Sequence, residues 1–147
     1  MNARLLVTYD CHRSCALCCN KDASGPKPAV TTLKALVKYE TILITGGEPL
    51  LYPYRLLDLI HDLKRITKAK IIVYTAMAEN HEHLEAFIRA ADGITLTLHT
   101  QEDATNFHGF SHRDLPRGKS NRLNIFEGVR PLVPAGGHRS AQEEQER

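Results

Sequence analysis

Short strand-like runs alternate with amphipathic helical stripes along most of this chain, and that alternation constrains its fold more than any other feature. The runs are rich in β-branched residues, which favour strands. They are Arg4–Tyr9, Thr41–Thr45, Lys70–Thr75, Gly93–His99 and Arg122–Phe126. Strands that alternate with helices indicate βαβ units with right-handed crossovers and a mostly parallel sheet.

Apolar residues spaced three and four apart mark the helical stripes between these runs. The stripes begin at Leu33, Leu56 and Leu84. Thr31 or Thr32 is suited to cap the first, and Asn80 is suited to cap the third, because their side-chain oxygens can accept from free backbone amides.

The chain length limits how much of a barrel this alternation can build. With 147 residues it supports one domain, whereas a complete (βα)8 barrel needs about 250 residues. We therefore predict an α/β fold, a partial, open (βα) barrel with a mostly parallel sheet of about five strands. Residues 1–133 form its core domain. Residues 134–147 are rich in Gly, Arg, Gln and Glu, a composition typical of a disordered tail.

Charge and hydropathy exclude two classes of partner. The formal net charge is +2 and the basic residues are scattered, so nucleic acid is not expected. The apolar stretches fall far short of the roughly 20 residues that span a bilayer, so no membrane partner is expected. The N-terminus has no signal-peptide pattern, and cytoplasmic localisation is the expectation.

All four cysteines lie between Cys11 and Cys19, whereas a disulfide framework ties distant segments together. Cys11, Cys15 and Cys18 give the spacing C-x3-C-x2-C directly after the first strand-like run. Three thiolates can hold three irons of a cubane cluster, and the usual complement is four. The remaining iron can then be chelated by the amino and carboxylate groups of a methionine moiety.

Two other interpretations of the cysteines stay open. Structural zinc could use Cys19 or His12 as its fourth ligand, although zinc sites usually join two ligand pairs from separate segments. Alternatively, the spacing could line one face of a buried helix. The polar residues His12, Arg13 and Ser14 between the first two cysteines disfavour that packing role.

A glycine turn follows the second strand-like run. Gly46 and Gly47 allow close approach of the backbone to a ligand, and Pro49 drives Glu48 into an extended conformation. The stretch Gly46–Pro49 is thus predicted to present a rigid strip of carbonyl acceptors for a ligand ammonium group. The alternative is an ordinary turn between a strand and a helix.

Together the two motifs resemble the radical S-adenosylmethionine (SAM) superfamily. Its cluster motif is matched by Cys11-His12-Arg13-Ser14-Cys15-Ala16-Leu17-Cys18, and its Gly-Gly-Glu-Pro stretch by Gly46–Pro49. The resemblance covers roughly 4–99. One departure is Leu17, because the family commonly has an aromatic residue there, near the adenine. Cys19 is extra, and we interpret it as a small hydrophobe.

The resemblance implies a metal-binding, oxidoreductase-type enzyme with two cofactors. A 4Fe-4S cluster on Cys11, Cys15 and Cys18 would reductively cleave SAM to a 5′-deoxyadenosyl radical that abstracts hydrogen from an unidentified substrate. The strip Gly46–Pro49 would bind the methionine amino group. Thr75 and His99, at two further strand ends, would face the same pocket and contact the ribose or carboxylate of SAM, unless they are caps or ordinary hydrogen-bonding residues.

Several partners follow from the resemblance. A one-electron reductant of the flavodoxin or ferredoxin type is implied. Asn20, close behind the third cysteine, is shared with glycyl-radical activases of the anaerobic ribonucleotide reductase type, which act on a protein partner. The open sheet favours a macromolecular substrate or partner subunit that completes the pocket wall, and the rival is a lid formed by the polar segment 101–120. A non-catalytic iron–sulfur or zinc binding module is the remaining alternative.

Overall fold

Six parallel strands form one sheet whose order, β1-β2-β3-β4-β5-β6, follows the chain. The computed structural model describes residues 1–8, 32–110 and 115–130 and the backbone of 143–146. The strands are β1 (Asn2–Leu6), β2 (Thr41–Thr45), β3 (Lys70–Thr75), β4 (Gly93–Leu98), β5 (Arg122–Phe126) and β6 (Glu143–Glu146). The predicted α/β class and parallel sheet are confirmed. Strand β6 lies inside the segment 134–147 whose composition indicates a tail.

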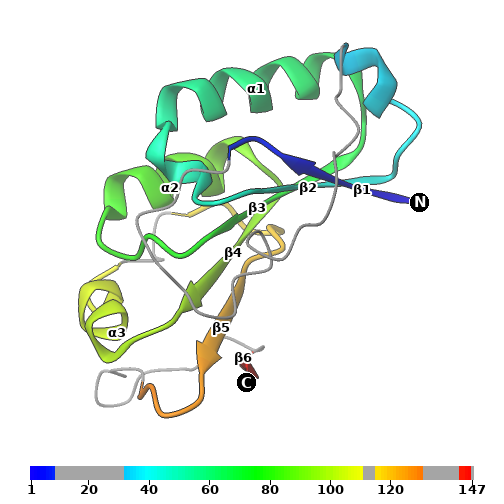
Figure 1. Cartoon of the computed structure of the whole chain (residues 1–147). Helices are drawn as coiled ribbons and strands as arrows, with labels where there is room; N and C mark the ends of the chain where they lie inside the picture. Colours follow the sequence, from blue (N-terminus) through cyan, green and yellow to red (C-terminus); the bar gives the residue numbers. More distant parts are fainter. Residues whose placement is uncertain (9–31, 111–114, 131–142, 147) are drawn as a thin grey trace.

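The helices gather on one side of this sheet. They are α1 (Pro53–Ile66), α2 (His81–Ala90) and α3 (Gln101–Phe107), with short 3-10 turns η1 (Leu33–Leu36) and η2 (Pro49–Leu51). Figure 1 shows α1, α2 and α3 following one another along the same flank of the strands. This is what crossovers of one hand require when every step moves to the next strand in the same direction.

The strand predictions held closely wherever β-branched runs have sharp ends. Strands β2, β3 and β5 have the predicted bounds, and β4 ends one residue early, at Leu98. Strand β1 begins at Asn2 rather than Arg4 and ends at Leu6, before Val7 and Thr8 of the predicted run. Its pairing with β2 matches Asn2 to Thr41 and Leu6 to Thr45.

The helix predictions held for two stripes of three. Helix α2 begins after Asn80, whose side chain accepts from the His83 amide as predicted. The first stripe forms only the turn η1, whose N-cap Thr32 makes no side-chain cap bond. Strand β2 begins at Thr41, which leaves too few residues downstream for a helix to propagate, and Pro26 and Pro28 interrupt the sequence upstream.

Alternate residues of β2, β3 and β4 enter the core between sheet and helices. This core cluster contains Ile42 and Ile44 of β2, Ile71 and Val73 of β3, and the β4 residues Ile94, Leu96 and Leu98. Ile72 is also buried but is absent from the cluster, because its side chain points to the opposite face. We call that opposite side, which α1, α2 and α3 do not cover, the open face.

The Asp92 carboxylate links three elements at the amino-terminal edge of the sheet. Asp92, just before β4, accepts 2.8 Å from the Ile71 amide and pairs with Lys64 of α1. Burial raises the pKa of Asp92, but the hydrogen bonds from Lys64 and Ile71 and the charges of Lys64 and Lys119 outweigh it, so the pKa lies below its ordinary value of 3.8. Asp92 therefore joins α1, β3 and β4 far from the carboxyl ends of the strands.

Candidate functional site

The predicted site residues that the structure describes are Gly46–Pro49, Thr75 and His99, and they lie at the carboxyl edge of the sheet, where βα proteins place their chemistry. Cys11, Cys15, Cys18, Cys19 and the predicted adenine neighbour Leu17 are outside the described residues, so their ligand roles stay predictions. Within the described part of the chain, no three His, Cys, Asp or Glu residues gather as a metal site. The structure therefore bears on the turn that follows β2 and on the ends of β1, β3 and β4.

The glycine turn is packed directly against the chain that leaves β1. The Gly47 amide donates to the Thr8 carbonyl oxygen over 2.7 Å, and the Val7 amide donates to Thr45 over 3.1 Å. Gly46 has φ +140°, and a β-carbon on it would lie 2.3 Å from the Thr8 carbonyl oxygen. Only glycine satisfies both conditions, so this position is dictated by the contact with Thr8.

The carbonyl groups of the turn differ in whether they accept a hydrogen bond from the described backbone. The Glu48 carbonyl accepts from the Leu51 amide at 3.1 Å, and the Pro49 carbonyl accepts from the Tyr52 amide at 3.3 Å. Among the described residues, none donates to the Gly47 carbonyl oxygen. In the predicted strip of carbonyl acceptors, the Glu48 and Pro49 carbonyls are therefore already used within the turn, whereas the Gly47 carbonyl accepts from no described residue.

Glu48 is extended, with φ −136° and ψ 101°, as Pro49 predicts, but its carboxylate is an unforeseen feature of the site. The residue is 1% exposed. Its Oε2 accepts from the Leu50 amide at 2.9 Å and from the Thr75 hydroxyl at 2.7 Å. Its Oε1 accepts from the Ala76 amide at 2.7 Å. The side chain thus ties the glycine turn to the end of β3.

Thr75 is placed with Glu48 and the core. It shares its parity along β3 with Ile71 and Val73, which belong to the core cluster, and it is 5% exposed. Its hydroxyl donates to Glu48 and accepts from the Met77 amide at 3.0 Å. This arrangement matches the alternative of a hydrogen-bonding residue at a strand end, and a direct ligand contact by Thr75 stays a prediction.

His99 has the opposite parity, on the open face. Its ring contacts Phe126 of β5, with centroids 4.2 Å apart and an interplanar angle of 61°. Its amide donates to Asp103 Oδ2 at 2.8 Å. Asp103 and Thr100 form a capping box that begins α3, a pattern readable in the sequence as a threonine followed three residues later by an acid.

The open face carries polar side chains in addition to His99. Thr45, Thr95 and Asn124 are buried there, and Tyr74 is 37% exposed. Arg4 of β1 donates from Nε to the Thr45 hydroxyl at 3.0 Å. Buried faces of parallel sheets are usually apolar, whereas the buried positions of this face include hydroxyl and amide groups.

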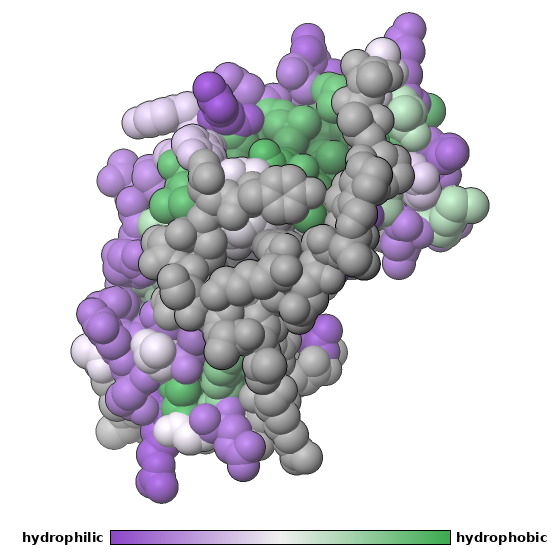
Figure 2. All heavy atoms as spheres, viewed as in Figure 1, coloured by the Kyte–Doolittle hydropathy of each residue, from purple (hydrophilic) through white to green (hydrophobic). Residues whose placement is uncertain are grey.

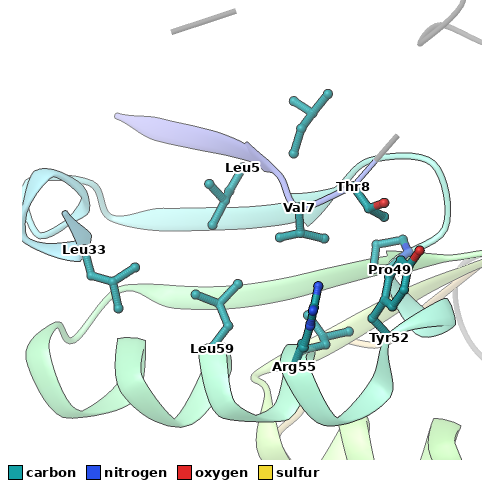
Figure 3. A pocket seen from close by; sticks show the side chains of 10 residues that line it. Leu5, Val7, Thr8, Leu33, Pro49, Tyr52, Arg55 and Leu59 are labelled. Atoms are coloured by element: carbon teal, nitrogen blue, oxygen red, sulfur yellow. The ribbon is translucent and has the colours of Figure 1, made fainter. Parts of the chain in front are cut away.

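A pocket of about 370 Å³ lies under β1 on the helix side of the sheet. Leu5 of β1 and Val7, just after β1, point toward Leu59 and Arg55 of α1 (Figure 3). The predicted helix at Leu33 would pack in this region, and only the turn η1 forms there. Figure 2 shows hydrophobic surface over the β1 and α1 region. This pocket and the open face are therefore on opposite sides of the sheet.

Residues 101–110 of the segment 101–120 belong to the helix layer. Ala104 of α3 is in the core cluster, and Phe107 and Phe110 pack against that cluster. The ring centroids of Phe110 and His81 of α2 are 5.5 Å apart. These contacts place α3 as the crossover helix between β4 and β5.

Comparison with family models, curated proteins and solved structures gives no match for this chain. Among the described helices, none is both long and apolar enough to traverse a bilayer. The proposal that follows therefore stands on the two motifs and on the geometry of the strand ends.

Proposed function

We propose that this protein is a radical SAM enzyme that binds a 4Fe-4S cluster on Cys11, Cys15 and Cys18. The observation that carries the proposal is the hydrogen bond from the Gly47 amide to the Thr8 carbonyl. Cys11 is three residues after Thr8, and three residues reach at most about 11 Å. The cysteine motif therefore starts within reach of the glycine turn, as one ligand bound by both motifs requires.

The residues at the turn fit the methionine end of SAM. The close approach at Gly46 leaves room for no side chain, and the Gly47 carbonyl oxygen is an acceptor for the ammonium group. Beside the turn, the open face carries Thr95, Asn124 and His99, and we propose that the polar remainder of the ligand lies along it. When bound, the cluster and SAM would supply reductive cleavage of the sulfur–carbon bond, and the chain's own residues bind, orient and shield them.

A macromolecular substrate or partner subunit fits this proposal better than a lid. Helix α3 and Phe110 pack into the helix layer, so residues 101–110 do not cover the open face as a lid would. We propose a cytoplasmic enzyme served by a one-electron reductant of the flavodoxin or ferredoxin type. A glycyl-radical activase acting on a protein partner is one such enzyme.

Anaerobic reconstitution tests the cluster assignment. The wild-type protein should bind one oxygen-sensitive 4Fe-4S cluster, measured by iron and sulfide content and by visible absorbance. Alanine at Cys11, Cys15 or Cys18 should abolish it, because each thiolate holds one iron. Cys19→Ala is the matched control and should keep the cluster. A stoichiometric zinc ion without a visible chromophore would contradict the proposal.

The reaction is tested on the reconstituted wild-type protein. After reduction with dithionite, SAM should be converted to methionine and 5′-deoxyadenosine, detected by chromatography. A protein that holds the cluster and leaves SAM intact would be a non-catalytic iron–sulfur module instead.

A further inference from the structure

The buried carboxylate of Glu48 holds two neighbouring strand ends together. Among the residues that the structure describes, it accepts hydrogen bonds from the Leu50 amide, the Thr75 hydroxyl and the Ala76 amide. Leu50 belongs to the turn after β2, whereas Thr75 and Ala76 belong to the end of β3. We call this set of bonds the Glu48 clamp.

Burial decides which role the carboxylate can have. A buried charged group is stable only when hydrogen bonds replace its lost hydration, and the Glu48 clamp provides such bonds to both oxygens. Because Glu48 is 1% exposed and Thr75 is 5% exposed, neither side chain presents a polar group on the surface of the turn. Both side chains are bonded to protein groups, so the contribution that we assign to them passes through the backbone that they hold.

The backbone that they hold includes the Gly47 carbonyl. The Gly47 amide is fixed to Thr8 on the β1 side, and the next residue, Glu48, is fixed to β3. The peptide group between Gly47 and Glu48 is thus held from both neighbouring strands. Hydrogen bonds to a charged acceptor are the stronger kind, so this arrangement sets the direction of the Gly47 carbonyl.

We propose that Glu48 is a positioning residue that orients the Gly47 carbonyl toward the methionine ammonium group of SAM, and that Thr75 acts in the same way through Glu48. This inference rests on the proposed function. It assigns Thr75 a role in SAM binding without a contact between its hydroxyl and the ligand.

Glu48→Gln is the informative substitution because it keeps the shape of the side chain. In either orientation of the amide, its NH2 group faces at least one backbone amide, that of Leu50 or that of Ala76, which then loses its acceptor. The turn should then populate the binding-competent arrangement only in part, and apparent affinity falls by that fraction. We expect SAM to bind at least about tenfold more weakly, which corresponds to about 1.4 kcal/mol.

Two measurements separate positioning from general destabilisation. Amide hydrogen exchange in the cluster-free protein should accelerate at Leu50 and Ala76 in Glu48→Gln. SAM affinity is then measured by calorimetry on the cluster-loaded protein. Asp92→Asn is the matched control: it also removes a carboxylate that accepts from a backbone amide, at the opposite edge of the sheet, and it should leave SAM affinity unchanged.

A second pair of variants covers the case in which Glu48→Gln does not fold. Thr75→Val keeps the shape and loses the hydroxyl, so SAM should bind more weakly, and Thr75→Ser should restore affinity. Wild-type affinity in both Glu48→Gln and Thr75→Val would overturn the positioning role. Failure of the cluster-loaded wild-type protein to bind SAM would instead overturn the proposed function, and the role of the clamp with it.

Discussion

Replacing Gly46 by alanine tests whether β1 and the glycine turn form one rigid unit. The added β-carbon would lie 2.3 Å from the Thr8 carbonyl oxygen and 3.1 Å from the Thr8 nitrogen. Both are backbone atoms, so no rotamer change relieves the overlap. Either the turn or the chain leading to the cysteines must move, and the hydrogen bond between Gly47 and Thr8 is then lost.

The expected cost can be estimated from its parts. A positive φ costs an L-residue about 1–2 kcal/mol, and the lost hydrogen bond costs about 1 kcal/mol. The free energy of unfolding should therefore fall by about 2–3 kcal/mol, a substantial share of the roughly 5–15 kcal/mol typical of a domain. At about 2–4 °C per kcal/mol, Tm should fall by roughly 4–12 °C.

Urea denaturation of the cluster-free protein measures this cost, with Gly118→Ala as the matched control. Gly118 has φ +81°, and nothing lies within 4 Å of a β-carbon there, so its substitution includes the backbone term alone. The difference between the two variants contains the contact with Thr8 together with the greater backbone strain at φ +140° than at φ +81°. Equal losses of stability would refute a rigid contact, and so would full cluster incorporation by Gly46→Ala on reconstitution.

Two further predictions concern the opposite edge of the sheet. Because the pKa of Asp92 is lowered, the ionised carboxylate stabilises the fold fully above the ordinary pKa of 3.8, and this stabilisation is lost as pH falls through the folded-state pKa. The free energy of unfolding, measured as a function of acid pH, should show this loss in the wild type and not in Asp92→Asn. Gly93→Ala would place a β-carbon 2.1 Å from the Ser120 carbonyl oxygen, and we expect the free energy of unfolding, measured by urea titration, to fall by about 1–3 kcal/mol. A urea midpoint equal to that of the wild type would show that the loop before β5 moves freely.

The strands were predictable because their signal is local. Runs such as Thr41–Thr45 and Lys70–Thr75 combine β-branched residues with clear ends, and all of these runs form strands of one sheet. The helix expected at Leu33 failed for a reason that is not local. Its apolar spacing is sound, but β2 begins at Thr41, and a helix needs length to offset nucleation.

The position of the candidate site could be predicted from the sequence, but the hydrogen bonds that hold it could not. The sequence indicates that the glycine turn lies at a strand end, and it indicates the extended Glu48. It does not indicate Thr8, because that residue contributes a backbone carbonyl and leaves no side-chain pattern. Nor does it indicate that the Glu48 carboxylate is buried, since that depends on Thr75 at the end of a strand that comes 25 residues after β2.

Side-chain parity at the ends of β3 and β4 assigns different roles to residues that look alike in the sequence. Thr75 and His99 both follow apolar strands, and both were predicted to contact SAM. Thr75 has the parity of Val73 and meets the Glu48 carboxylate inside the protein. His99 has the parity of Thr95 and Thr97, on the open face, beside Phe126. A ligand on the open face would therefore meet His99 directly and would depend on Thr75 only through the turn that Thr75 helps to hold.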